Sequence, residues 1–420
     1  MDLFEKCDTD AGYFGPYRHA GDTYLTRPVL DPQPGNRMLF RGKQHIMWSV
    51  NNYIGLAGNE EVRQVALDAV KEFSVSAPMG SRMMSGNTEH HLALERDLSA
   101  MAGKEAAFLF NYGYLGVIGT IASLVGPDDT VVMDKLSHAS IIDGVLLAKA
   151  SGAKMRVFRH NDAENLEMVL KRESRDTKGG ILVVGEGVYG MTGDLANLPA
   201  ITEVCQKYGA RIFVDDAHGW GVMGKEGRGT ADYFGVQDKL DIYFATFAKA
   251  YASIGGFAAS AKKVVDWIAY NARTQVFAKS LPMVYVKSLH KTLELVKAGE
   301  DARKKMWENS KKLKEGIRAL DYFVGEGASP ICAVFTPSGD EEEGARMVGY
   351  LREKGIFVTA VIYPVIPRGL IMFRMIPTAA HTDEDINTTI KVFAEMRNDL
   401  ALKLPVSQEG MANIRRAYGA

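Results

Sequence analysis

The segment RIFVDDAHGWG, residues 211–221, passes from a short apolar run into a polar turn that contains glycine. The apolar run predicts a buried strand, and the turn places Asp215 and His218 directly after that strand. Similar apolar runs predict further strands at 105–110, 129–134, 155–160, 181–187 and 241–247. Helical periodicity predicts helices at 60–74, 140–152 and 198–209. This alternation predicts an α/β fold with a mainly parallel sheet flanked by helices.

The rest of the chain predicts a second, smaller domain. The alternation of short apolar runs and helical segments ends after Pro282. One long helical stretch then runs to about Leu320 and is followed by shorter strands and helices. Residues rich in Gly, Pro and charge at the N-terminus predict an arm on the surface rather than part of a core. The predicted division is an arm and active-site segment at 1–58, a large cofactor-binding domain at 59–300, a small C-terminal α+β domain at 301–402 and a polar tail at 403–420.

Composition narrows the classes of function. The 420 residues carry 50 Lys and Arg against 51 Asp and Glu, so no global field favours nucleic acid or an acidic membrane. The three cysteines are too few and too scattered for a disulfide framework or a Cys-rich metal cluster, and no metal site is expected. The N-terminus lacks the apolar core of a secretory signal, and no apolar run approaches the ~20 residues of a membrane span. We expect a cytoplasmic protein with at most peripheral membrane contact.

Polar clusters follow three of the predicted strands, and they contain SHAS (137–140), DDAHGWG (215–221) and TFAKA (246–250). Each cluster taken alone has an ordinary structural explanation. The lysine could be a solvated cation, the aspartate a loop cap, and His138 part of a helix cap with its flanking serines. Because ligands bind at the carboxyl ends of parallel strands, the three together predict one catalytic cleft. A lysine and a carboxylate in such a cleft are what pyridoxal phosphate (PLP) needs, together with a cradle for its phosphate.

The order of these motifs resembles one family over nearly the whole chain, from about Met38 to Leu400. The matching segments are NNYIGLAGN (51–59), GSRMMSGNTEHHLALE (80–95), NYGYLG (111–116), SHASIIDG (137–144), GVYGMTGDLANLP (187–199), VDDAHGWG (214–221), GVMGKEGRGTADYFG (221–235), TFAK (246–249) and PTAAHTDEDI (377–386). The chain resembles the α-oxoamine synthases, which are fold-type I PLP enzymes with a seven-stranded-type sheet. Its branch resembles the bacterial serine palmitoyltransferase-like enzymes.

The resemblance implies a role for each matching residue. Lys249 would form the Schiff base with PLP and later act as acid and base, Asp215 would pair with the pyridine nitrogen, His218 would bind the phenolic oxygen, and His138 would stack on the ring. The phosphate would be held by the backbone at Gly113, Tyr114 and Leu115, by the Thr246 hydroxyl, and by Ser280 of a second subunit. Arg374 would bind the substrate carboxylate, and Asn52 would line the site. A homodimer with shared active sites is therefore implied.

The implied reaction is a decarboxylative condensation of an amino acid with a long-chain acyl thioester, carried on CoA or on acyl carrier protein. Serine, or its sulfonate analogue cysteate, is the implied amino acid, and the product is a 3-keto long-chain base for sphingolipids or capnine-type sulfonolipids. The departures Ala248, Gly190, Asp216 and Lys279 from the family pattern leave the amino acid open. Lys279 is either an extra cation for the substrate or a solvent-facing residue at the dimer seam. The alternatives are 2-amino-3-ketobutyrate CoA ligase, 8-amino-7-oxononanoate synthase, a plain aminotransferase and a non-catalytic scaffold; because Lys249 and Asp215 are both present, the scaffold is disfavoured.

Overall fold

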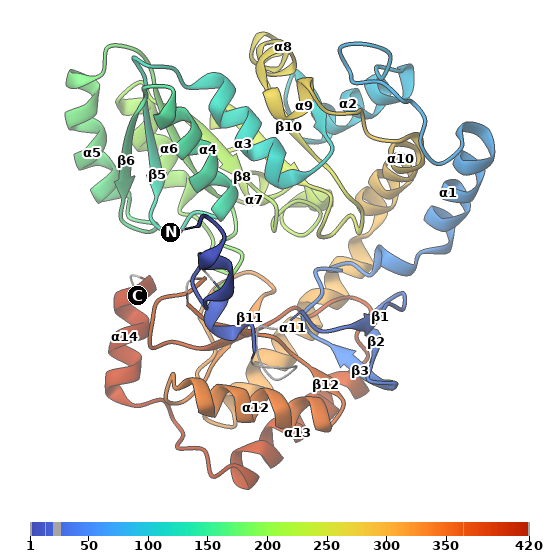
Figure 1. Ribbon diagram of the computed structural model, residues 1–420, viewed down its shortest axis with the longest axis vertical. Coiled ribbons are helices and arrows are strands. Elements are labelled where there is room, and N and C mark those ends of the chain that lie inside the picture. The colour runs from blue at the N-terminus through green and yellow to red at the C-terminus, as the bar shows by residue number, and fades with distance from the viewer. Residues whose placement is uncertain (1, 13, 20–26, 364, 419–420) are drawn as a thin grey trace. The chain divides into compact units, whose positions relative to one another are not determined.

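The computed structural model describes residues 2–12, 14–19, 27–363 and 365–418 (Figure 1). The chain divides into two compact units. The large unit comprises Ile54–Gly190 and Asp194–Asp301, and the small unit comprises Met1–Tyr53, Met191–Gly193 and Ala302–Ala420. Each unit has its own sheets and its own core, so each is described separately.

The large unit is built on a seven-stranded sheet with the order β4-β10-β9-β8-β7-β5-β6. Its strands are β4 (Ala106–Phe110), β5 (Thr130–Asp134), β6 (Lys154–Phe158), β7 (Ile181–Glu186), β8 (Arg211–Asp215), β9 (Ile242–Thr246) and β10 (Gly256–Ser260). Strands β5 to β9 pair in parallel, whereas β10 pairs antiparallel with both β4 and β9. Every residue of β5, β9 and β10 is buried, which explains why β5 and β9 appear in the sequence as mainly apolar runs.

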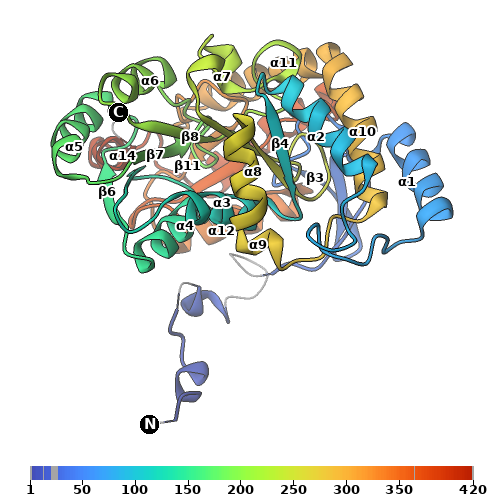
Figure 2. The same cartoon turned by 90° about the horizontal axis from the view of Figure 1, so that it is seen from above.

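Helices cover both faces of this sheet. They are α1 (Glu60–Phe73), α2 (Glu89–Met101), α3 (Gly113–Leu124), α4 (Ala139–Ala150), α5 (Ala163–Asp176), α6 (Leu198–Lys207), α7 (Thr230–Tyr233), α8 (Lys262–Asn271), α9 (Arg273–Val276) and α10 (Met283–Ala298). Helix α3 contacts α4, α8 and α9 on one side of the sheet, and α5 contacts α6 on the other (Figure 2). Apolar side chains of α3, α4 and α8 form one buried cluster with those of the strands.

The small unit contains two sheets. One has the order β1-β2-β3-β12, with strands β1 (Leu30–Asp31), β2 (Arg37–Phe40), β3 (Lys43–Met47) and β12 (Ile356–Phe357). The other has the order β11-β14-β13, with strands β11 (Cys332–Phe335), β13 (Ala360–Val361) and β14 (Met372–Met375). Its helices are α11 (Glu300–Arg318), α12 (Glu341–Glu353), α13 (Asp383–Asp399) and α14 (Gln408–Tyr418). A buried cluster around Trp48, Phe373 and Phe393 forms the core.

The sequence predictions hold for most of the large unit. The six predicted strands and the three predicted helices are present with boundaries within a few residues, and Gly209 after α6 has a positive φ of 66°. The sheet is mainly parallel and has seven strands, as expected. Strand β10 was not predicted, because the run GGFAAS is too short and too rich in small residues to distinguish a strand from a turn.

Three predictions outside this sheet differ from the structure. The single long helix expected over 284–320 is two helices, α10 and α11, with Gly299 between them. The expected surface arm contributes strands to the small unit, where Phe40 is buried against Met47 and Phe357. The segment expected as a polar tail forms α14, whose Ile414 is buried in an apolar cluster with Phe335. In each case a distant partner in the chain, which local composition does not reveal, supplies the missing contact.

Among the described helices, none combines the length and the apolar character that a bilayer crossing requires.

Candidate active site

The carboxyl ends of β5, β7, β8 and β9 lie at one edge of the large sheet, and the predicted polar clusters follow three of them. Asp215 is the last residue of β8, Thr246 is the last residue of β9, and Lys249 follows three residues later. His138 comes after β5 and is separated from Asp215 in the sheet by β7. The sheet order therefore places the loop after β7 between the two predicted clusters.

Asp215 is a buried carboxylate with few compensating contacts. Its side chain is 5% exposed, and its Oδ1 accepts a hydrogen bond of 3.1 Å from the Ala217 backbone N–H. Burial raises its pKa to about 7, while the charge of Lys249 acts in the opposite direction. A cation placed against this carboxyl group, such as a protonated ring nitrogen, would stabilise its ionised form.

The N-terminus of α3 forms a cradle beside Thr246. No described side chain caps this helix, so the backbone N–H groups of its first turn have no partner within the helix. A Cβ atom at Gly113 would lie 2.6 Å from the Thr246 Oγ1, so only a glycine allows the helix to begin this close to β9. Thr246 Oγ1 donates to the Gly255 carbonyl at 2.9 Å and accepts from the Ala248 N–H at 3.2 Å. A helix N-terminus without a side-chain cap, beside a hydroxyl group, favours an anion.

His138 is held in place by the loop and the helix that it joins. Its Nδ1 accepts a hydrogen bond from the Ser140 backbone N–H at 3.2 Å and lies 2.7 Å from the Ser140 Oγ. A backbone N–H can only donate, so the proton of the neutral imidazole lies on Nε2. The Tyr114 ring meets this imidazole edge-on, with ring centroids 6.0 Å apart, and the Tyr114 hydroxyl donates to Asp143 at 2.5 Å. His138 as a whole residue is exposed, as access by a flat ligand requires.

His218 lies against the loop after β7. A Cβ atom at Gly190 would be 2.5 Å from the His218 Nε2 and 2.7 Å from its Cδ2. Because real Cβ atoms do not approach so closely, any other residue at 190 would displace the imidazole. Gly190, which departs from the family pattern, therefore lies directly against His218, a predicted site residue.

Glu186, the last residue of β7, was not predicted as a site residue. Its side chain is 7% exposed, and it accepts hydrogen bonds from the His138 N–H at 2.7 Å and from the Gly190 N–H at 3.3 Å. Burial, together with the negative charge of Asp215, raises its pKa to about 8. The signal available in the sequence was a single carboxylate inside the apolar run ILVVGEG, directly at a predicted strand end.

Asp216, another departure from the family pattern, has a supporting position. It is fully buried and accepts hydrogen bonds from the Thr230 N–H and hydroxyl at 2.6 Å each and from the Tyr243 hydroxyl at 2.7 Å. Burial raises its pKa, and the three donors oppose that shift. These bonds fix the turn that carries His218.

Ser280 and Lys279 lie in the segment before α10. The Ser280 hydroxyl is buried and donates to the Gly80 carbonyl of the same chain at 3.1 Å. The Lys279 carbonyl accepts a hydrogen bond from the Asn111 amide, and its side chain is partly buried. The structure thus places both residues beside the segment 80–111, which leads into the cradle at α3.

The two predicted substrate residues belong to the small unit. Arg374 lies in β14, and its guanidinium donates two hydrogen bonds of 3.2 Å to the Asn51 Oδ1. The adjacent Asn52 is 6% exposed. The buried Tyr53, whose pKa burial raises to about 12, is close enough to Arg374 for the guanidinium to oppose that shift. Arg374 is therefore oriented by a neutral amide oxygen.

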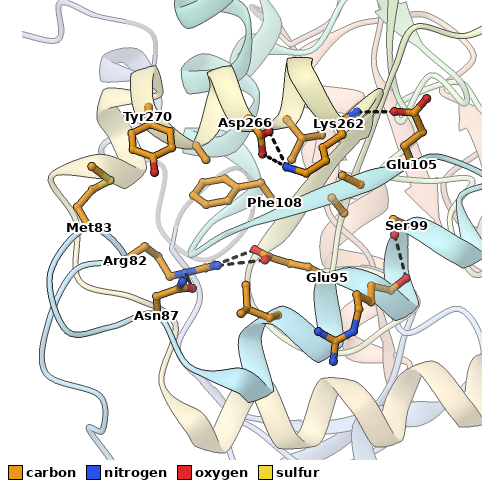
Figure 3. A pocket seen from close by; sticks show the side chains of 16 residues that line it. Arg82, Met83, Asn87, Glu95, Ser99, Glu105, Phe108, Lys262, Asp266 and Tyr270 are labelled. Atoms are coloured by element: carbon orange, nitrogen blue, oxygen red, sulfur yellow. Dashed lines mark hydrogen bonds and ion pairs between the residues drawn. The ribbon is translucent and has the colours of Figure 1, made fainter.

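A separate pocket of about 440 Å³ lies on the large unit between α2, β4 and α8 (Figure 3). Its described lining includes the bidentate ion pair of Arg82 with Glu95, at 2.8 and 3.0 Å, and the ring of Phe108 below the guanidinium. No predicted site residue is among the described residues that line it. The pocket lies near the first residues of β4, away from the strand ends that carry the polar clusters.

The residues at the carboxyl edge fit PLP. The glycine cradle at α3 suits a phosphate, the buried Asp215 suits a protonated ring nitrogen, and Lys249 follows the same edge. A parallel sheet with helices on both faces and this set of groups defines the fold-type I PLP-dependent enzymes.

Comparison with known proteins identifies the family. The aminotransferase class I and II family matches residues 43–393, and the chain belongs to it. Within that family the α-oxoamine synthases are the branch that the chain matches.

Cysteate-C-fatty acyltransferase of Capnocytophaga ochracea is 43% identical over 403 residues, covering 95% of each chain. The 8-amino-7-oxononanoate synthase of Alkaliphilus metalliredigens is 36% identical over 379 residues, 90% of this chain and 94% of the other. Serine palmitoyltransferase from S. paucimobilis, solved with a PLP–myriocin aldimine, has a TM-score of 0.88 at 29% identity, covering 96% of this chain and all of the other. The predicted family, fold, enzyme class and PLP cofactor are confirmed.

Proposed function

We propose that this protein catalyses the PLP-dependent decarboxylative condensation of cysteate with a long-chain acyl thioester. The observation that carries the choice of cysteate is the 43% identity to a cysteate-C-fatty acyltransferase over 95% of both chains. The residues of the carboxyl edge support the chemistry, because they provide the amine, the carboxylate and the anion cradle that the reaction requires.

The reaction forms one carbon–carbon bond and breaks two bonds. The Cα of cysteate loses its proton and attacks the acyl carbon, the thiol leaves with one proton, and the original carboxylate leaves as CO₂. Protonation of Cα then gives a 2-amino-3-keto alkanesulfonate. When bound, PLP supplies a ring that accepts the electron pair left at Cα.

We assign the following roles to residues of the large unit. We assign Lys249 to the covalent attachment of the cofactor and to the transfer of the proton at Cα. Asp215 holds a proton on the ring nitrogen, and its burial makes that charge pair strong. The N-terminus of α3, with the backbone N–H groups of Gly113, Tyr114 and Leu115, binds the phosphate together with Thr246. His218 would bind the phenolic oxygen of the cofactor, and His138 would lie against its ring.

The small unit contributes the amino-acid site in this proposal. Arg374 binds the substrate carboxylate, for which the planar guanidinium is suited, and Asn51 orients it. Asn52 lines the same site. Lys279 is the residue of the large unit that we assign to the sulfonate, because it is a partly buried cation beside the cradle segment.

We further propose that the active enzyme is a homodimer and that its acyl donor is an acyl-CoA or an acyl carrier protein. Large apolar side chains around the cradle and Ser280 are exposed in the single chain, which supports coverage by a second copy; they include Met84, Tyr112, Tyr114, Leu115 and Phe277. Light scattering of the purified enzyme tests the dimer. A monomer at micromolar concentration would contradict it.

Visible-absorption titration of the purified holoenzyme with cysteate, serine, glycine and alanine tests the choice of amino acid. We expect cysteate to change the cofactor spectrum at the lowest concentration, and an acyl thioester added afterwards to yield CO₂ and the ketone. Saturation by serine alone would move the assignment to sphingolipid bases. Turnover with 2-oxo acids, in place of acyl thioesters, would indicate an aminotransferase and contradict the proposal.

The test of Lys279 uses the variant Lys279→Gln. We expect the KM for cysteate to rise about tenfold, since one ion pair is lost, while the KM for serine stays unchanged. Equal KM changes for both amino acids would show that Lys279 does not bind the sulfonate.

A further inference from the structure

Three neighbouring strand ends meet at Glu186. The strand order β8-β7-β5 places β7 in the middle, and Glu186 is its last residue. In the strand register, Glu186 lies opposite Asp215 on β8. The loops that follow β5 and β8 carry His138 and His218, respectively. A group at the end of β7 thus lies between the two loops.

The two carboxyl oxygens of Glu186 accept hydrogen bonds from two different segments, the one after β5 and the one after β7. Oε1 accepts the His138 backbone N–H at 2.7 Å, and this bond fixes the residue that begins α4. Oε2 accepts the Gly190 N–H at 3.3 Å. Gly190 in turn forms the surface against which the His218 imidazole lies, since an added Cβ atom would be only 2.5 Å from its Nε2. One side chain therefore binds the backbone of His138 and the backbone of Gly190, against which His218 lies.

Because Glu186 is buried, breaking its hydrogen bonds costs free energy. Glu186 is 7% exposed, and the groups that face it from the neighbouring strands, Asp215 on β8 and Asp134 on β5, are carboxyls as well. A buried N–H that loses its acceptor retains the full cost of desolvation. If Glu186 served packing alone, a buried apolar side chain would meet the need without placing a third carboxyl group at this edge.

We infer that Glu186 is a positioning residue which fixes His138 through its backbone and His218 through Gly190, and thereby sets the contacts of the cofactor ring. This inference rests on the proposed function, because it assigns both imidazoles to the cofactor. Glu186 itself touches neither histidine ring.

The variant Glu186→Gln tests the inference. A glutamine has the same shape, but its NH₂ cannot accept from an N–H, so one of the two backbone bonds is lost. We expect the dissociation constant for PLP to rise and kcat to fall by about 10- to 100-fold, with the KM for the amino acid within twofold. The absorption maximum of the bound cofactor and its pH midpoint should both shift. Glu186→Asp keeps two acceptor oxygens and should restore part of each value.

The variant Gly190→Ala tests separately whether Gly190 positions His218. The added methyl group overlaps the His218 ring and should shift the pH midpoint of the cofactor spectrum, with no loss of the His138 bond. Gly349→Ala in α12 is the matched control, because a Cβ atom there has no neighbour within 4 Å. That control should leave the spectrum unchanged.

A structural role alone gives a different result. Glu173→Gln in α5 removes a fully buried carboxylate that pairs with Arg156 and Arg172, so it should lower the melting temperature without altering the cofactor spectrum. If Glu186→Gln behaved like Glu173→Gln, with spectrum, PLP affinity and kcat unchanged, the inference would be overturned while the wild-type activity still supported the proposed function. If the wild-type enzyme failed to bind PLP, the proposed function itself would fail.

Discussion

The two edges of the large sheet use charged residues in opposite ways. At the edge formed by the first residues of the parallel strands, the charged groups bind to other groups of the chain: Asp241 pairs with Arg211 and accepts the Ile212 N–H, and Lys104, whose pKa burial lowers, donates to two carbonyl groups. At the carboxyl edge, Asp215 and Glu186 are buried and burial raises the pKa of both groups. The charged groups of the first edge bind to the chain itself, whereas the carboxyl edge holds two carboxyl groups whose ionised forms burial disfavours.

This difference distinguishes a structural pocket from an active site. The pocket of Figure 3 is concave and contains an arginine and carboxylates, yet its buried charges are bound to each other. Perturbed carboxyl groups beside an uncapped helix N-terminus are the stronger indication of function. The predictions below replace residues of the carboxyl edge and of this pocket, and they compare the effect on activity with the effect on stability.

The largest effect is expected for Asp215→Asn at the carboxyl edge. Without the carboxylate, the ring nitrogen is no longer held protonated, so kcat should fall by about 10²- to 10³-fold. Steady-state kinetics with cysteate and an acyl thioester measure this loss. A decrease of less than threefold would remove Asp215 from the assigned role.

The same variant should gain stability as an apoenzyme. The folded chain holds the Asp215 proton up to a pKa of about 7, whereas the unfolded chain releases it near pH 4. The folded state therefore loses stability as the pH rises between these two values. The asparagine variant does not lose this stability, because its side chain does not ionise. At pH 8 the apo variant should melt a few degrees above the wild-type apoenzyme, and the gap should close toward pH 4. Equal melting temperatures at both pH values would contradict the pKa shift.

Glu95→Gln in the pocket of Figure 3 should show the reverse pattern. Its side chain and that of Arg82 are 9% and 7% exposed, so breaking the pair leaves a buried guanidinium uncompensated and costs about 3 kcal/mol. Urea denaturation measures this free energy. At 20 °C the folded fraction should keep the wild-type kcat, and a parallel loss of kcat would show that this pocket also serves the reaction.

The smallest effect is expected for Thr246→Val. The side chains have the same shape, so the hydroxyl alone is removed, and the dissociation constant for PLP should rise about fivefold. Equilibrium dialysis of the cofactor measures the change, with kcat at saturating PLP as the control. An unchanged affinity would place the phosphate elsewhere.

The sequence predicted what local pattern determines. Continuous apolar runs predicted the buried strands, and the polar residues after them located Asp215, His138 and Lys249 at strand ends. Glu186 was not found, because its importance depends on β7 lying between β5 and β8, and sheet order is a property of distant pairings. The same reason explains why the burial of Phe40 and Ile414 was missed: each packs against residues far away in the chain.

The assigned roles of Arg374 and Asn52 rest on the family resemblance rather than on local pattern. Arg374 lies within the apolar segment LIMFRMIP, which predicts a strand but not what its charged residue binds. Its two bonds to Asn51 became visible only in the structure. Gly190 is similar: the sequence marks it as a departure from the family pattern, but only the structure shows that His218 lies against it.

The most direct test of the account is to reduce the purified enzyme with borohydride and locate the cofactor by peptide mass spectrometry. The account predicts that the reduced pyridoxyl phosphate is attached to Lys249, in the peptide that follows β9. Attachment to another lysine, or none at all in enzyme that is active with cysteate, would contradict the assignment of the carboxyl edge as the active site.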